Sequence, residues 1–140
     1  MTKAGTLAAV GFMLVRLTAV PTVALANPVA ECQAATSNQV ETSQCLRDTL
    51  GAAQQVLGLA LQDARAKADS IDQVTGRLEA RPALDQSESE WEQFRDINCA
   101  VPSAFAAGGS GSGQFALSCQ ITMTRARTQE LFELAAGVGT

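Results

Sequence analysis

Histidine and tyrosine are absent from the sequence, and aromatic residues make up only 4% of its 140 residues. Without histidine, neither a Cys–His nor a Ser–His–Asp nucleophile can be assembled, and a zinc site would need all four cysteines or help from carboxylates. Basic residues are also scarce, with 10 Lys and Arg against 14 Asp and Glu. A nucleic-acid surface needs clustered Lys and Arg. The composition therefore argues against a metal site, a catalytic triad and a nucleic-acid partner.

The first 26 residues contain no acid and read as a secretory signal peptide. Lys3 precedes a long apolar run, and the small residues of Ala24-Leu25-Ala26 are what signal peptidase requires, so we expect cleavage after Ala26. Arg16 interrupts the run and would cost roughly 2.5–3.5 kcal/mol at the centre of a membrane helix, which disfavours a permanent anchor. Translation could start at Met1 or at Met13. Export and a periplasmic or secreted location are expected in both cases, with residues 27–140 as a single domain and no membrane span after cleavage.

The mature part is acidic and contains every cysteine. Its 8 basic and 14 acidic residues give a formal charge of −6, which favours encounter with a cationic partner. Cys32, Cys45, Cys99 and Cys119 are an even number in a small exported domain, which predicts two disulfides. Cys32 does not fit a lipoprotein site, because the charged Glu31 stands where a small residue is needed.

Apolar spacing predicts an all-α fold with three helices. The segment before the first helix is polar and poor in helix signals. A long amphipathic helix is then expected from Asn38–Glu41 to about Ala80, because apolar residues recur every three or four positions. Gly51 and Gly58 lie on one face of it, where they either weaken or kink the helix or let another helix approach closely.

The second half of the chain predicts two further helices around a glycine-rich connection. Ser87 and Glu90 match a capping box, so a second helix, antiparallel to the first, should begin there and run to about Cys99, where Val101-Pro102 stops it. Residues 106–114 carry four glycines and two serines and are expected to form a flexible loop. A third helix should run from about Leu117 to Gly137, which is a plausible C-terminal cap.

Three spaced signatures carry a family resemblance: Trp91-x-x-Phe94-Arg95-Asp96-x-x-Cys99, then Gly108-Gly109-Ser110, then Cys119-x4-Thr124-x2-Arg127-x3-Leu131. Together they closely resemble the LprI-like lysozyme-inhibitor family of small exported bacterial proteins. The sequence departs from the family pattern in the first helix, where Gln54, Gly58 and Leu61 replace an Asp, an Asn and an aromatic residue. Glu88 likewise stands where a Gln before the Trp is usual.

Structural roles account for the signature residues. Trp91 and Phe94 are expected to be core anchors rather than ligand stackers. Arg95 and Asp96 are adjacent on a helix and should need different partners. Arg127 can pair with Glu130 or with Asp96.

The remaining polar groups also receive structural interpretations. Thr124 is expected on the buried face of the third helix, where its hydroxyl should donate a hydrogen bond to a backbone carbonyl. Glu88, Glu90 and Glu92 should lie on the solvated side of a capped helix start, which argues against glycosidic carboxylate chemistry. We therefore predict no catalytic residue, no metal and no cofactor.

The resemblance implies an inhibitor that blocks a cationic lysozyme by binding at its substrate cleft. The candidate binding loop comprises Gly108, Gly109, Ser110, Gly111 and Ser112, and it could equally be only a connector. The alternative is a structural or adaptor protein of the cell envelope that uses a helical face and binds no lysozyme. An acidic body could steer the approach to a cationic enzyme.

Helix length bears on the disulfide pairing. An unbroken first helix from Glu41 to Glu79 would span about 57 Å, whereas a return helix ending at Cys99 covers less than half of that. Disulfides need Cα atoms within about 7 Å, so the pairs Cys32–Cys45 and Cys99–Cys119 are expected. A sharp bend at Gly58 would instead bring Cys45 towards Cys99.

Overall fold

The computed structural model describes residues 27–109 and 111–137, and every regular element in these ranges is an α-helix. Helix α1 spans Pro28–Ala35, α2 Gln39–Thr75, α3 Ala80–Phe105 and α4 Ser112–Ala136. The all-α prediction is therefore confirmed. The expected signal peptide, with its cleavage site after Ala26, lies outside the described residues. Ser110 also lies outside them. None of the described helices combines the length and the apolar character that a membrane crossing requires.

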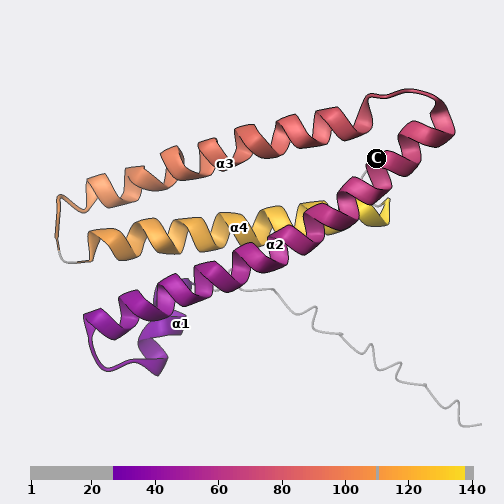
Figure 1. The fold of residues 1–140 in the computed structure, drawn as a ribbon. Coiled ribbons are helices and arrows are strands. Elements are labelled where there is room, and N and C mark those ends of the chain that lie inside the picture. The colour runs from indigo at the N-terminus through magenta and orange to yellow at the C-terminus, as the bar shows by residue number, and fades with distance from the viewer. Residues whose placement is uncertain (1–26, 110, 138–140) are drawn as a thin grey trace, which may run out of the picture.

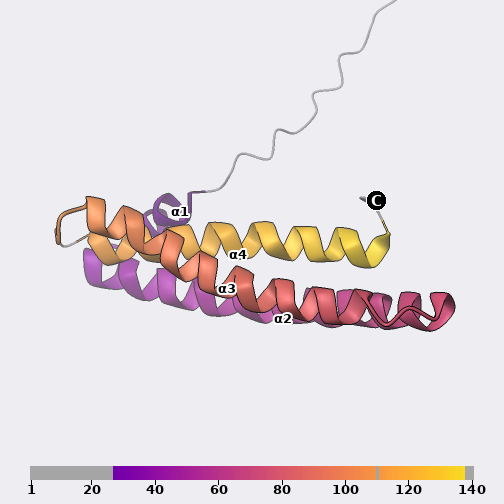
Figure 2. The ribbon, with the colours of Figure 1, turned by 90° about the horizontal axis from the view of Figure 1, so that it is seen from above.

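The three long helices form an elongated bundle in which α2 and α4 pack most extensively and run in the same direction (Figure 1). Helix α3 returns antiparallel to both. Seen from above, α3 lies over α2 near the turn that joins them and over α4 near its other end (Figure 2). Ion pairs of Asp85 with Arg65, and of Arg81 with Asp69, hold α3 to α2 at the turn end. A disulfide joins α3 to α4 at the opposite end.

Both predicted disulfides are confirmed. Cys32 and Cys45 have Cα atoms 5.7 Å apart and join α1 to α2, and Cys99 and Cys119 have Cα atoms 5.4 Å apart and join α3 to α4. Helix α2 is continuous through Gly58, so the bend that would have favoured Cys45 with Cys99 does not occur.

Helix α1 was not expected, because the segment before Asn38 has few local helix signals. Asn27 caps it by accepting a hydrogen bond from the Val29 N–H, and Pro28 fits the first turn, where no N–H is needed. A helix of eight residues is marginal in isolation. The bond from Cys32 to α2 and the ion pair of Glu31 with Arg125 of α4 fix it in place.

Helix α2 begins where predicted and ends slightly earlier. The Asn38 side chain accepts hydrogen bonds from the N–H groups of Val40 and Glu41. The helix ends at Thr75 because Gly76 adopts a left-handed conformation with φ of 68°. A Cβ added at Gly51 or Gly58 would have no neighbouring heavy atom within 4 Å. The expectation that another helix approaches closely at these glycines is therefore wrong.

Helix α3 differs from the prediction at both ends. It begins at Ala80, where the Asp72 carboxylate of α2 accepts hydrogen bonds from the N–H groups of Glu79, Ala80 and Arg81. A side chain from the preceding helix thus supplies the cap, and the predicted capping box at Ser87 and Glu90 lies inside the helix. Pro102 does not stop α3, because it removes only one hydrogen bond and the Ala106 N–H donates to its carbonyl to close the last turn.

Helix α4 begins five residues before the predicted Leu117 and ends at the predicted cap, Gly137, which has φ of 74°. The core lies mainly between α2 and α4. Its two clusters contain Leu57, Ala60, Ala64 and Leu131, and Cys32, Leu46 and Ile121. Helix α3 contributes one fully buried apolar residue, Cys99, and the partly buried Leu84 and Trp91.

Candidate functional site

The glycine-rich connection between α3 and α4 is shorter than the sequence predicts. Ser112 and Gly113 are already helical, so the connection comprises residues 106–111. Ala107 and Gly108 have positive φ angles of 50° and 74°, and the Gly109 N–H donates a hydrogen bond to the Ala106 carbonyl. These turns make a compact corner, with Gly108 and Gly109 exposed. Of the candidate loop residues, Ser110 lies outside the described part of the chain.

A groove of about 580 Å³, here called the loop groove, runs between α3 and α4 beside this corner. Small side chains line most of it, including Ala100, Ala104 and Ser112 together with Gly108. Cys99 lies in its wall, so the disulfide to Cys119 pins the two helices beneath the loop. The base of the loop is therefore rigid, which lowers the entropic cost of presenting the loop to a partner.

The outer face of α3 carries a row of exposed apolar side chains that leads to the loop. Phe94, Ile97, Val101 and Phe105 recur at helical spacing and are 57%, 72%, 50% and 87% exposed, respectively. We call this row the α3 stripe. The prediction that Phe94 is a core anchor is wrong, whereas its neighbour Trp91 is half-buried and packs against the core cluster around Leu57.

Arg95 and Asp96 form a pair, contrary to the expectation that they need different partners. The Arg95 side chain folds back so that Nε and Nη2 donate to Asp96 Oδ1 at 3.0 and 2.9 Å. The same guanidinium lies over the Trp91 ring, with its carbon 5.3 Å from the ring centroid. The long flexible arginine can reach a neighbour that shorter side chains could not. The Arg95 side chain is only 10% exposed, so it is a structural part of the bundle.

Arg127 pairs with Glu130, as one of the two alternatives predicted, but its second partner is Glu88 of α3 rather than Asp96. Nε and Nη2 of Arg127 both donate to Glu88 Oε1. Burial opposes the charge on Arg127, but the hydrogen bonds with Glu88 and Glu130 outweigh this, so the pKa of Arg127 is raised above its ordinary value. Glu88 is buried, so its predicted place on the solvated side of a helix start is wrong.

Thr124 and Leu131 both lie on the buried face of α4 and are fully inaccessible. Among the described residues, Thr124 Oγ1 has no hydrogen-bond partner, so the predicted bond to a backbone carbonyl is wrong. The carbonyl of Thr124 instead accepts the hydroxyl of Thr128, one turn later. Leu131 packs in the core with Leu57 and Ala64.

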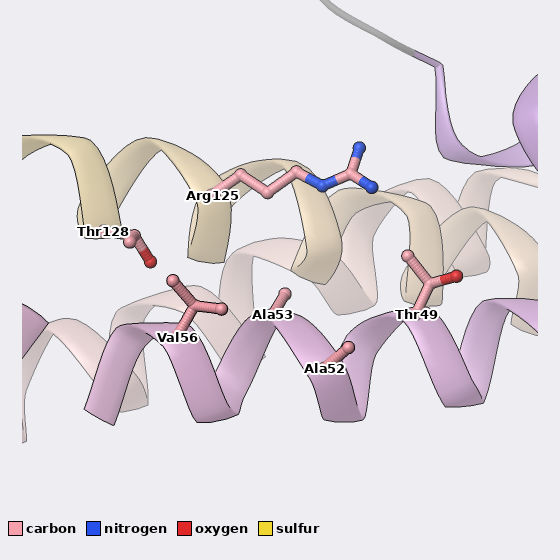
Figure 3. A pocket seen from close by; sticks show the side chains of 6 residues that line it. All are labelled: Thr49, Ala52, Ala53, Val56, Arg125 and Thr128. Atoms are coloured by element: carbon pink, nitrogen blue, oxygen red, sulfur yellow. The ribbon is translucent and has the colours of Figure 1, made fainter. Parts of the chain in front are cut away.

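Two further grooves were not anticipated from the sequence. One, of about 300 Å³, lies between α2 and α4, where Arg125 and Thr128 project above Thr49, Ala53 and Val56 (Figure 3). The Arg125 guanidinium is already paired with Glu31 of α1, to which it donates two hydrogen bonds of 3.1 Å. The groove is therefore a mostly apolar depression whose one charge is satisfied.

The second unanticipated groove lies between α2 and α3 and has a volume of about 330 Å³. We call it the α2–α3 groove. It is lined by seven residues: Gln54, Leu57, Gly58, Leu61, Glu88, Glu92 and Arg95. A sequence signal for its α3 wall exists, because Glu88 and Arg95 share the helical spacing of the half-buried Trp91 and the buried Cys99. Nowhere in the described ranges do three His, Cys, Asp or Glu residues come together in a way that could hold a metal ion.

A comparison with known protein families shows to which family the chain belongs. The family model described as lysozyme inhibitor LprI matches residues 30–131, which include α2 and α3 in full, most of α1 and α4, and both disulfides. The chain belongs to the LprI family. No curated protein and no solved structure matches it. Gln54, Gly58, Leu61 and Glu88, the four positions at which the sequence is expected to depart from the family pattern, all line the α2–α3 groove.

Proposed function

We propose that this LprI-family chain is an exported, non-catalytic protein that inhibits a lysozyme by binding at its substrate cleft. The family is one of lysozyme inhibitors, and the two disulfides fit an exported protein. We further propose that the mature protein is a single domain beginning at Asn27, which carries the charge of −6. That charge would draw it towards a cationic enzyme.

The end of the bundle that carries residues 106–111 supports the proposal best. A corner with exposed Gly108 and Gly109 projects beyond two helices that a disulfide holds together. Glycines leave backbone donors and acceptors accessible, and a narrow corner can enter a cleft that a helix cannot. The α3 stripe ends at Phe105, immediately before this corner, and offers apolar area next to it. An exposed apolar patch beside a polar protrusion is typical of a protein-binding surface.

The experiment is a muramidase assay on a peptidoglycan suspension with purified residues 27–140 added at several salt concentrations. Inhibition at near-stoichiometric ratios that weakens with salt is expected, because screening reduces attraction between the charged proteins. A Gly109→Leu variant should inhibit less at an unchanged melting temperature, since Gly109 has a negative φ and its new Cβ would meet only the Ala106 carbonyl, at 3.4 Å. Gly51→Leu on α2 is the matched control. Inhibition that Gly109→Leu leaves intact would place the inhibitory surface elsewhere.

The α3 stripe favours one alternative, an adaptor that binds another envelope protein through this face. Four large apolar side chains in water are costly unless a partner covers them. The muramidase assay separates the two functions. If the wild-type protein does not inhibit at any salt concentration, the adaptor function is favoured.

A further inference from the structure

The α2–α3 groove is a candidate binding site distinct from the loop end. Its α3 wall runs from Glu88 to Arg95, whereas the loop begins after Phe105, about 15 Å further along the helix axis. Its lining residues come from α2 and α3, and Figure 2 shows that α3 leaves α2 and crosses towards α4 along its length. Its walls combine apolar side chains, Leu57 and Leu61, with charged ones from α3.

Two buried charged side chains in this groove each keep one polar atom unused. The Glu88 side chain is 8% exposed, and Arg127 bonds only Oε1. The Arg95 side chain is 10% exposed, and Asp96 takes Nε and Nη2. Within the described part of the chain, neither Glu88 Oε2 nor Arg95 Nη1 has a hydrogen-bond partner. Both atoms keep contact with solvent, since Thr124 Oγ1 is the only buried side-chain polar atom without a partner in this part of the chain. Glu88 Oε2 can accept a hydrogen bond from a ligand that enters the groove.

The charge around the groove favours a cation. Four carboxylates, of Glu88, Glu92, Asp96 and Glu130, stand against the guanidinium groups of Arg95 and Arg127. The local formal charge is therefore −2. Asp96 balances the charge of Arg95, whereas Glu92 is exposed and forms no ion pair with any described residue. The carboxylate of Glu92 is one helical turn from Glu88, so both can face one ligand.

We propose that the α2–α3 groove binds an arginine side chain of a partner protein. The guanidinium presents N–H donors in several directions and can serve Glu88 Oε2, Glu92 and the Gln54 amide oxygen from two helices. The methylene stem of the arginine contacts Leu57 and Leu61. This inference rests on the proposed function in one respect, since the partner it names is the cationic lysozyme, which would contact this groove as well as the loop end.

Gly58 offers a way to close the groove without disturbing the fold. A Cβ there would meet nothing within 4 Å and Gly58 lines the groove, so a leucine at this position fills the groove without displacing a neighbour. Helix α2 tolerates the change, because glycine is the weaker helix former. Gly51 lies two turns earlier on the same face of α2, has equally open surroundings and does not line the groove. Gly58→Leu and Gly51→Leu are therefore a matched pair.

Trp91 provides a direct readout of the groove. It is the single tryptophan of the chain, it is half-buried, and the Arg95 guanidinium covers its ring. A cation bound between Glu88 and Glu92 repels the neighbouring Arg95 guanidinium, which should alter its contact with Trp91 and so change the fluorescence of Trp91. The probe is N-acetyl-arginine amide, titrated into residues 27–140 at low salt. N-acetyl-citrulline amide, a neutral molecule of nearly the same shape, is the matched control ligand.

We expect a saturable fluorescence change with the arginine probe and none with the citrulline probe over the same concentrations. Glu92→Gln should weaken binding about fivefold, because it removes one exposed ion pair. Gly58→Leu should abolish binding, whereas Gly51→Leu should leave it unchanged. Equal responses to the two probes, or binding that survives Gly58→Leu, would overturn the proposal. So would a response to N-acetylglucosamine oligomers in place of arginine, which would make the groove a sugar site.

The muramidase assay separates this proposal from the proposed function. If the arginine probe binds but the wild-type protein does not inhibit lysozyme, the groove proposal stands for another basic partner and the inhibitor function fails. If lysozyme is inhibited and Gly58→Leu inhibits equally well, the inhibitor function stands and the groove proposal fails as a contact with lysozyme. Joint support requires that Gly58→Leu loses both probe binding and part of the inhibition, at an unchanged melting temperature.

Discussion

The interface between α2 and α4, here called the seam, is built from a different kind of side chain than the contacts that attach α3 to these two helices. The seam buries Leu57, Ile121 and Leu131, which are apolar and almost fully inaccessible. The inner face of α3 instead buries Glu88 and Arg95 beside the half-buried Trp91, while four other large apolar residues form the outer α3 stripe. Burial of apolar area stabilises the seam, whereas charge pairs with α2 and α4 and a disulfide to α4 position α3. Helix α3 is thus held in a specific place while its outer apolar side chains stay exposed.

The largest expected effect is on the seam. Leu131→Ala should reduce the free energy of unfolding by about 3–4 kcal/mol, because Leu131 is fully buried between α2 and α4. Phe94→Ala removes a larger side chain from the outer face of α3 and should change stability by less than about 1 kcal/mol, because Phe94 is mostly exposed. Urea unfolding of both variants measures this. Equal losses would show that the outer face of α3 is part of the core.

The charged attachment of α3 should give the next largest effect. Arg127→Met leaves Glu88 buried without its partner and should cost roughly 3 kcal/mol. Replacing both residues, as Glu88→Leu with Arg127→Met, should cost clearly less than the sum of the two single changes, because no unpaired charge remains. A double-mutant cycle from chemical unfolding measures the coupling. Additive losses would mean that the pair contributes nothing to holding α3.

A smaller effect concerns the turn end of α3, where Asp72 caps the helix. The hydrogen bond from the Ala80 N–H lowers the pKa of Asp72 most; burial opposes this, and the N–H groups of Arg81 and Glu79 add to the lowering. A carboxyl whose pKa is lowered in the folded state stabilises the fold when the pH is above the ordinary carboxyl pKa near 4. This contribution disappears as the pH falls through the folded-state pKa.

Asp72→Ala should therefore lower the melting temperature by a few degrees at pH 7 and by less at pH 2–3, where the wild-type carboxyl is increasingly protonated. Thermal unfolding followed by circular dichroism across this pH range tests the sign. The pKa of Asp85 is also lowered, by hydrogen bonds from Arg81 and Arg65. Asp85→Ala should therefore show the same trend with pH and is a second test of the sign at this end of α3. A deficit for Asp72→Ala that grows at low pH would contradict the capping role.

The seam was more predictable from the sequence than the attachment of α3. Apolar residues at three- and four-residue spacing marked the long α2, and helix length correctly excluded the pair Cys45–Cys99. The start of α3 was missed because its cap, Asp72, comes from another helix and no local pattern reports it. Phe94 was misplaced for a related reason. Hydrophobicity alone puts it inside, whereas the buried spacing of α3 runs through Glu88, Arg95 and Cys99.

The candidate site was partly visible for the same physical reasons. Glycine content located the corner between α3 and α4, although Ser112 and Gly113 joined α4 because a helix can extend into residues of low propensity when its neighbours pack well. The α2–α3 groove could not be predicted, since it depends on how far α3 diverges from α2. That divergence follows from the two ends of α3 being fixed to different helices, by Asp85 and Arg65 at one end and by Cys99 and Cys119 at the other.

The smallest expected effect concerns Thr124, a polar residue buried in the seam. Thr124 Oγ1 is buried without a partner among the described residues, so the folded state bears the cost of removing this hydroxyl from water. Thr124→Val keeps the side-chain shape and the branching at Cβ, and it should stabilise the protein by up to about 1 kcal/mol. Thr128→Val, one turn later, is the matched control. Its hydroxyl donates to the Thr124 carbonyl at 2.8 Å, so the same substitution there should destabilise by roughly 0.5–1 kcal/mol. Chemical unfolding should thus give opposite signs for two identical replacements on one helix face. A loss of stability in Thr124→Val would show that its hydroxyl does form a hydrogen bond, and the seam would then be polar at its centre in the same sense as the attachment of α3.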